Sequence, residues 1–272
     1  MLISLPEPYG LPDDWLALPF NHCNLPARYL ACLAFQLEPV ALQLDGVHLM
    51  YADLFDRLDA CPDRRTRRRC FTDFMAVRFH LPAAELPEVP AMGPVPRPRL
   101  HYGQMLLGWL FDSDNQQGAI WRQWVESRFG LCTRFYKEPI TGPDDPAYGR
   151  FLHTAGWAGY NSNALYNQLD LLYSFCQYQL VRDFPLRRRL TLYRGGTERP
   201  SHSFEGQPVM LLNNLCSCTD NPEEAFRFGP RVYQLEVPLP KIVCYQQLLP
   251  SVLQGEGEYM VLGGCYPVTP YA

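Results

Sequence analysis

The chain has 272 residues, of which 47% are apolar, so it can bury one large hydrophobic core or two small ones. Its formal net charge of −4 and pI near 5.9 give no general electrostatic attraction to nucleic acid or to a membrane surface. No apolar run approaches the length that spans a bilayer, and the first residues, MLISLPEPYGLPDDW, lack the basic and apolar regions of a secretory leader. We therefore expect a cytoplasmic globular protein, with neither nucleic acid nor membrane as its partner.

Ten cysteines are scattered along the sequence, and none of them forms a C-x-x-C pair. Most stand beside apolar residues, as in YLACLAF and YSFCQY, where a reduced thiol packs like a small hydrophobic side chain. His22, Cys23 and Cys32 are near one another in the sequence, but their spacing fits no zinc pattern and a fourth ligand is missing. The sequence thus predicts buried free thiols and no metal site.

The first predicted helix lies in MYADLFDRLDAC, where Leu54, Phe55 and Leu58 share one face at helical spacing. The stretch that follows carries a cluster of five arginines, here called the arginine cluster: Arg64, Arg65, Arg67, Arg68 and Arg69. Such a cluster can bind phosphates. Because the whole chain is acidic and no aromatic platform is interleaved with the cluster, we favour a solvated helix face or a docking surface for an acidic protein.

Residues 81–100, LPAAELPEVPAMGPVPRPRL, hold too many prolines for a helix or an inner strand, so we expect an extended connector. Helical periodicity returns in HYGQMLLGWLF and, after a start signal in DSD, in NQQGAIWRQWVESRFG; it recurs in the segment that ends at QLVRDF. After Pro185 the sequence changes to short apolar or alternating runs that Gly, Pro and Asn separate, which is typical of strands. The expected class is α+β, with a helical region over 1–100 packed on a second region over 101–272 as one continuous domain.

Polar residues stand at the ends or edges of these predicted strands. Arg194 closes LTLYRGG, Ser217 and Thr219 lie in LCSCTD, and Glu256 and Glu258 lie in GEGE. Each has an ordinary structural explanation: a surface salt bridge, a strand edge or helix cap, and a solvated loop. However, residues two apart in an extended segment point to the same side, and two carboxylates held together are costly unless a cation or donor joins them.

In this order and spacing, the three elements resemble the signature of the arginine, serine and glutamate class of mono-ADP-ribosyltransferases. Nearly the whole chain, including NHCNLPARYLACLAFQ, GWLFDSDNQQGAIWRQWVESRFGL and NQLDLLYSFCQYQL, resembles the dinitrogenase reductase ADP-ribosyltransferases of nitrogen-fixing bacteria. The resemblance implies the ADP-ribosyltransferase fold, in which a mixed or antiparallel β-sandwich core would follow the helical part. One departure is Cys218, which stands at the middle of the Ser-Thr-Ser element, whereas Thr219 keeps a hydroxyl at its third position.

The activity that this resemblance implies is a glycosyl transfer from NAD to protein arginine. ADP-ribose would pass from NAD to one arginine of the nitrogenase iron protein, which releases nicotinamide and switches off nitrogen fixation, and a PII-type signalling protein would be a second partner. No metal is expected, and the absence of a strand followed by G-x-G-x-x-G argues against a dehydrogenase. The alternatives are the same chemistry on another protein, as in bacterial toxins, and a non-catalytic module that docks through the arginine cluster.

The roles of the site residues follow from the chemistry and the resemblance together. Arg194 suits the diphosphate of NAD because a guanidinium makes permanent, bidentate hydrogen bonds. The resemblance assigns Gly195 to backbone contact with the nicotinamide amide, and Ser217 to orienting Glu258 and the nicotinamide ribose. Glu258 would hold the ribose 2′-hydroxyl and stabilise the oxocarbenium-like transition state.

The remaining candidates surround these groups. Thr219 is expected to contribute to NAD binding, and Phe226 or Phe228 is a candidate for contact with nicotinamide, although core packing is the more ordinary role of such a residue. Glu256 would orient the acceptor guanidinium and accept its proton as the new bond forms, because removing that proton beforehand at pH 7 would cost roughly 7 kcal/mol. In the family a glutamate at this position accompanies arginine acceptors.

Overall fold

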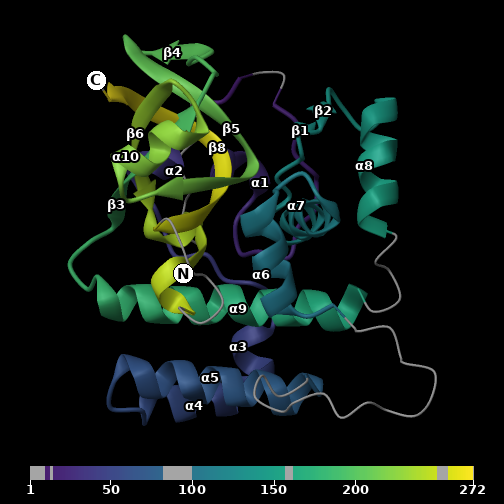
Figure 1. The fold of residues 1–272 in the computed structure, drawn as a ribbon, viewed down its shortest axis with the longest axis vertical. Coiled ribbons are helices and arrows are strands. Elements are labelled where there is room, and N and C mark those ends of the chain that lie inside the picture. Colours follow the sequence, from purple (N-terminus) through teal and green to yellow (C-terminus); the bar gives the residue numbers. More distant parts are fainter. Residues whose placement is uncertain (1–9, 13–14, 82–99, 157–161, 250–256, 272) are drawn as a thin grey trace.

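The computed structural model describes residues 10–12, 15–81, 100–156, 162–249 and 257–271 (Figure 1). The helices are α1 (Ala27–Ala31), α2 (Leu33–Leu37), α3 (Val47–Met50), α4 (Ala52–Asp59), α5 (Arg64–Phe79), α6 (Tyr102–Phe111), α7 (Gln116–Phe129), α8 (Pro146–Gly156), α9 (Ser162–Asp183) and α10 (Pro222–Ala225). The strands are β1 (Phe135–Tyr136), β2 (Glu138–Pro139), β3 (Arg189–Gly196), β4 (His202–Phe204), β5 (Gln207–Thr219), β6 (Arg231–Pro238), β7 (Ile242–Tyr245) and β8 (Glu258–Tyr271), with short 3-10 turns η2 (Phe226–Phe228), η3 (Leu239–Lys241) and η4 (Gln246–Leu248). The expected α+β class, with helices first and strands last, is confirmed.

Polar side chains set the starts of the long helices. Asp63 caps α5 by accepting a hydrogen bond from the backbone N–H of Thr66 at 2.8 Å, and Asn115 caps α7 through the N–H of Gly118 at 2.8 Å. The expected start signal in DSD is therefore one residue early, because the cap is the asparagine that follows it. Gly130 ends α7 at φ 70°, a left-handed conformation that glycine adopts without strain.

The main sheet closes on itself. Its strand order is β4-β5-β3-β6-β8-β7, and β5 also pairs with β8, so β5, β3, β6 and β8 form a ring of antiparallel pairs. The long strand β8 makes this possible because residues 258–267 pair with β5, some of them also with β7, and residues 268–271 pair with β6. The register puts Thr219 opposite Glu258 and, on the other side of β5, opposite Tyr193.

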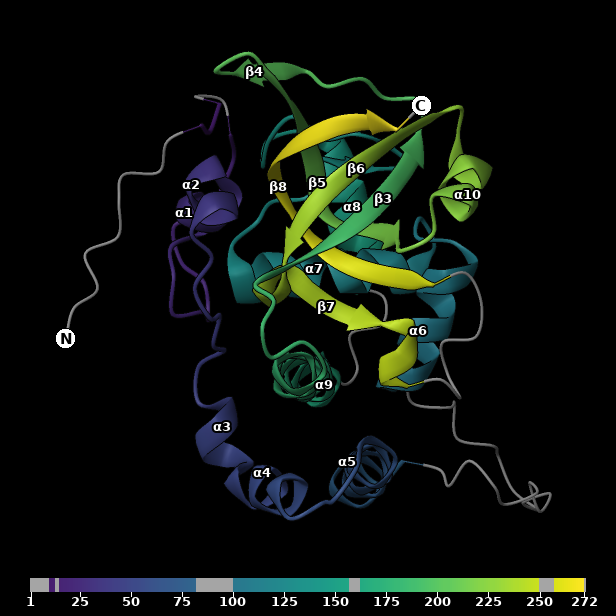
Figure 2. The same ribbon diagram turned by 90° about the vertical axis from the view of Figure 1, so that its left-hand side faces the viewer.

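Helices surround this ring in layers. Figure 2 shows α9 lying below the strands, with α4 and α5 beneath α9, while α6 and α7 lie along another side of the ring. Phe71 of α5 stacks on Phe175 of α9 with ring centroids 4.1 Å apart, and Leu54, Phe55 and Leu58 of α4 are buried as their spacing predicts. One hydrophobic cluster runs through residues from both the helical and the strand-rich parts of the chain.

Three members of the arginine cluster point inward, so the expectation of a solvated or docking face is wrong for them. Arg64 pairs with Asp183 at 3.1 Å, Arg67 donates to Gln179 at 3.0 Å, and Arg68 donates to the carbonyl of Gln247. These positions continue the buried stripe of α5 that packs on α9, and their guanidinium groups reach polar atoms at its edge. The other two arginines, at positions 65 and 69, are exposed.

The structure also bears on what the sequence predicts for the cysteines, for metal sites and for membrane-spanning helices. All ten cysteines are free thiols; eight of them are buried, whereas Cys61 and Cys70 are half-buried. Across the described residues, no group of three His, Cys, Asp or Glu side chains could hold a metal ion, and no helix is long and apolar enough to cross a membrane. Most of the proline-rich connector, residues 82–99, and Glu256 lie outside the described residues.

Candidate functional site

Arg194 lies near the end of β3, where it pairs in register with Tyr233 of β6. Its Nη1 atom donates a hydrogen bond to the backbone carbonyl of Ser217 on β5 at 3.0 Å, so the guanidinium is tied to the neighbouring strand. The pKa of Arg194 is raised above that of a free guanidinium, most of all by the side chain of Cys216. The structure therefore places a permanent cation beside the serine that the sequence pattern singled out.

The side chain of the same serine faces the glutamate. Ser217 Oγ donates to Glu258 Oε1 at 2.5 Å, and both residues are half-buried. This contact follows from the pairing of β5 with β8, which sets Ser217 opposite Met260 and Thr219 opposite Glu258. Ser217 thus joins two predicted site residues, with its carbonyl on Arg194 and its hydroxyl on Glu258.

Sequence reasoning missed a third partner of this pair, Trp109 of α6. Its indole Nε1 donates to Ser217 Oγ at 2.9 Å and to Glu258 Oε1 at 3.0 Å, and the residue is only 2% exposed. The helical periodicity of GWLF shows that Trp109 belongs to a buried face, but not which strand that face meets. The one available signal is general, because a buried tryptophan usually finds an acceptor for its N–H.

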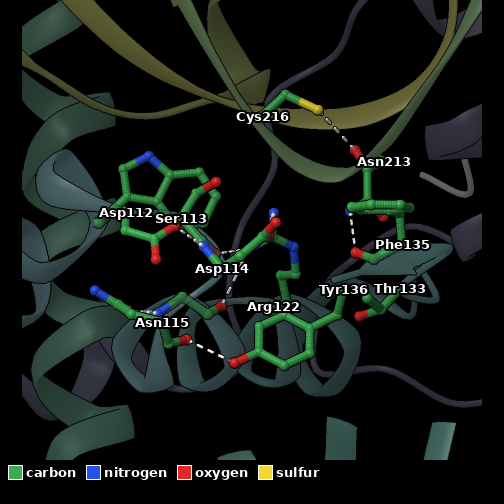
Figure 3. A network of polar contacts seen from close by, with 12 residues as sticks. Asp112, Ser113, Asp114, Asn115, Arg122, Thr133, Phe135, Tyr136, Asn213 and Cys216 are labelled. Atoms are coloured by element: carbon green, nitrogen blue, oxygen red, sulfur yellow. Dashed lines mark hydrogen bonds and ion pairs between the residues drawn. The ribbon is translucent and has the colours of Figure 1, made fainter. Parts of the chain in front are cut away.

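Arg122 of α7, which belongs to the polar network drawn in Figure 3, lies against the ring of Trp109. The guanidinium carbon of Arg122 lies 5.0 Å from the centroid of the Trp109 ring. Arg122 also pairs with Asp114 at 3.5 Å and donates to the carbonyl of Ser113 at 2.5 Å. Burial lowers the pKa of Arg122, while Asp114 opposes this effect. The loop before α7 therefore fixes a cation against the back of the tryptophan.

Two glycines allow the backbone to come close around the site. A Cβ atom at Gly195 would lie 1.7 Å from the carbonyl oxygen of Ala225, so the end of β3 and α10 could not approach as they do with a larger residue. Gly257 has φ +65°, and a Cβ there would lie 2.4 Å from Asp220 Oδ1. The turn that leads into Glu258 therefore packs directly against the turn that follows Thr219.

The remaining candidates, which are Thr219 and two phenylalanines, differ in how far they are buried. Thr219 is buried, and its Oγ1 accepts a hydrogen bond from the backbone N–H of Asn221 at 3.1 Å at the turn into α10. Phe226 and Phe228 lie on η2 with 39% and 60% of their surface exposed, so the ordinary explanation of core packing is wrong for both. Phe226 lies close to the ring of strands, since its own aromatic ring lies 6.3 Å from that of Tyr271 on β8.

Cys218 stands at the middle position of the Ser-Thr-Ser pattern, where this sequence departs from it. Because successive side chains of a strand alternate in direction, it points away from the side that carries the Ser217 hydroxyl. It is buried, and burial raises the pKa of its thiol to about 12, so the group stays neutral at pH 7. The substitution leaves the contact between Ser217 and Glu258 intact.

Comparison with known sequences agrees with this site. The sequence model of a family described as dinitrogenase reductase ADP-ribosyltransferase matches residues 20–270, which puts the chain in the class of ADP-ribosyltransferases. An NAD(+)–dinitrogen-reductase ADP-D-ribosyltransferase of Rhodospirillum rubrum is 35% identical over 257 residues, which cover 91% of this chain and 93% of the relative. The chain belongs to the dinitrogenase reductase ADP-ribosyltransferase family, as the resemblance in its sequence indicated. No solved structure matches it.

Proposed function

We propose that the protein transfers ADP-ribose from NAD to one arginine of dinitrogenase reductase, the iron protein of nitrogenase, and thereby switches off nitrogen fixation. The family match and the name of the Rhodospirillum relative support the substrate and the target. The observation that carries the chemistry is the position of Ser217, which binds Arg194 through its carbonyl and Glu258 through its hydroxyl. A cation for the diphosphate and a carboxylate for the ribose are thus held on either side of one residue.

The reaction breaks the bond between ribose C1′ and the nicotinamide nitrogen of NAD, and positive charge develops on the ribose. Arg194 binds the diphosphate, and the backbone at Gly195 contacts the nicotinamide amide. The Glu258 carboxylate accepts a hydrogen bond from the ribose 2′-hydroxyl and stabilises the developing cation with a negative charge that is already in place. Ser217 keeps that carboxylate oriented.

The acceptor is the guanidinium of the target arginine. Its nitrogen bonds to C1′ as nicotinamide leaves, and its proton passes to Glu256, since the acidity of that nitrogen rises as the bond forms. Phe226 is the favoured aromatic contact of nicotinamide, because it is exposed on η2 directly after Ala225, whose carbonyl lies against Gly195. Thr219 contributes by shaping the turn into α10.

We also propose that the strand-rich part has the ADP-ribosyltransferase fold with a β-sandwich core. The closed ring of antiparallel pairs supports this, since the inner faces of opposite sides of such a ring can pack as two layers around one interior. The catalytic region would span 101–272, with the helical region over 1–100 packed on it as one domain; the shared hydrophobic cluster supports this arrangement. A PII-type signalling partner and a cytoplasmic location stay predictions.

Mass spectrometry of purified iron protein after incubation with this protein and NAD tests the function. We expect one added ADP-ribose on a single arginine with the wild type, and none with Glu258→Gln. NAD cleavage without modified iron protein would favour the alternative of another protein target. No NAD turnover at all would favour a non-catalytic docking module.

A further inference from the structure

The indole of Trp109 contacts the catalytic pair, Ser217 and Glu258, from the helical part of the chain. Its N–H lies between two acceptors, Ser217 Oγ at 2.9 Å and Glu258 Oε1 at 3.0 Å. Ser217 in turn donates to the same Oε1 atom at 2.5 Å. Two donors from different elements therefore converge on one carboxylate oxygen.

The indole is itself firmly held. Trp109 is 2% exposed, and Arg122 lies over its ring at 5.0 Å while remaining tied to Asp114 and the carbonyl of Ser113. A cation over the ring draws electron density from the indole, which makes its N–H a stronger hydrogen-bond donor. Within the described part of the chain, the buried Arg122 Nε has no hydrogen-bond partner.

We propose that Trp109 is a positioning residue that holds Glu258 Oε1 and the Ser217 hydroxyl in place, so that the Glu258 carboxylate is oriented toward the ribose of NAD. This inference rests on the proposed function. A carboxylate on a flexible side chain rotates freely, and a misplacement of about 1 Å can cost about 100-fold in rate. Two fixed donors on Oε1 prevent that rotation before NAD binds.

The hydrogen bonds from Trp109 and Ser217 also favour the ionised form of the Glu258 carboxylate. Donors that bind the ionised form favour it over the protonated form, so the loss of one donor makes protonation easier. As the pH is lowered, the rate of a variant that lacks the indole N–H should therefore begin to fall at a higher pH than the rate of the wild type. A loss of packing alone lowers stability but does not move the acidic limb of the rate profile.

Trp109→Phe removes the N–H and keeps an aromatic ring. The matched control is Trp121→Phe, because the Trp121 indole is also fully buried but donates to the carbonyl of Met105 at 3.0 Å, away from the catalytic pair. We expect kcat for NAD cleavage to fall about 10- to 100-fold in Trp109→Phe, the range of a lost hydrogen bond to a charged group. KM for NAD should stay within about twofold, and the acidic limb of kcat/KM should move to higher pH. Trp121→Phe should show neither change.

A second measurement does not need an active enzyme. Among the five tryptophans of the sequence, the indole N–H resonance of Trp109 should shift in the NMR spectrum of Glu258→Gln, whereas that of Trp121 should not. The proposal is overturned if the Trp109 resonance stays unchanged, or if both tryptophan variants lose activity equally with unmoved pH profiles. A wild type that cleaves no NAD contradicts the proposed function, whereas the resonance shift still decides whether Trp109 holds Glu258.

Discussion

Lys241 should make the protein less stable at neutral than at mildly alkaline pH. The residue is fully buried on η3, where its Nζ donates to the carbonyl of Gly263 at 3.0 Å and lies 4.7 Å from the centroid of the Tyr266 ring. No carboxylate of the described residues pairs with it. Burial lowers the pKa of Lys241 from its ordinary 10.5 to about 7, against the smaller opposing effects of Cys265 and Cys32.

The sign and size of the effect follow from the two pKa values. Between pH 7 and 10.5 the unfolded chain carries a proton on this lysine that the folded protein has lost, so the free energy of unfolding rises with pH across this window. Below pH 7 both states carry the proton and the effect levels off. At 1.36 kcal/mol per pH unit the whole effect is at most about 5 kcal/mol, of which about 2 kcal/mol falls between pH 7 and 8.5.

Lys241→Met tests this because methionine fills a similar volume without a charge. Lys137→Met is the control, since Lys137 is the other lysine of the sequence and is exposed. Denaturant unfolding at several pH values should show Lys241→Met more stable than the wild type at pH 7, with the difference shrinking by about 2 kcal/mol at pH 8.5. Lys137→Met should follow the wild type throughout. If the difference between Lys241→Met and the wild type does not depend on pH, Lys241 keeps an ordinary pKa and the reasoning is refuted.

Three further predictions concern the reaction. Glu256→Gln should lose transfer to protein arginine while it keeps NAD binding and some NAD hydrolysis, because water needs no positioned guanidinium; equal loss of both activities contradicts a separate acceptor role. Arg194→Lys should weaken NAD binding by about tenfold or more in calorimetry, because one ammonium cannot hold the Ser217 carbonyl and a diphosphate together; unchanged affinity would show Arg194 to be structural. Replacing Arg65 and Arg69, the exposed members of the arginine cluster, by glutamine should raise KM for the iron protein at about 50 mM salt and much less at 300 mM, with NAD hydrolysis unchanged. Identical kinetics of this variant and the wild type at low salt would refute docking there.

The sequence predicts those parts of the structure that a local pattern determines. The spacing of Leu54, Phe55 and Leu58 predicts the buried face of α4. The alternation of β5 predicts that Ser217 and Cys218 point to opposite sides. A local pattern does not predict the contact between Ser217 and Glu258, because this contact depends on the pairing of strands about 40 residues apart. The family resemblance, rather than periodicity, indicates it.

The sequence does not predict which part of the structure each helix face contacts. Charge alone favours solvent for the arginine cluster, yet Arg64, Arg67 and Arg68 lie on the stripe that packs against α9, and their long apolar stems carry the guanidinium groups to polar acceptors at its edge. Likewise Trp109 is identifiable as a buried residue of a helix, but its two acceptors lie on β5 and β8, more than 100 residues further along the chain. Periodicity reports burial, whereas the identity of the neighbour is a property of the tertiary fold.

The register between β5 and β8 is the feature on which the whole site depends. The pairing shifts between Leu212 and Leu215, where Gly263 accommodates the carbonyl of Asn213; a Cβ at Gly263 would lie 1.9 Å from that oxygen. Beyond this irregularity the strands run in register to Thr219, which brings the Ser217 hydroxyl to Glu258. A slip of one residue would turn Cys218 toward the glutamate instead and would remove the Ser217 hydroxyl, which is one of the two acceptors of the Trp109 indole. The irregular stretch in the middle of the strand pair therefore fixes the positions of catalytic groups at its end.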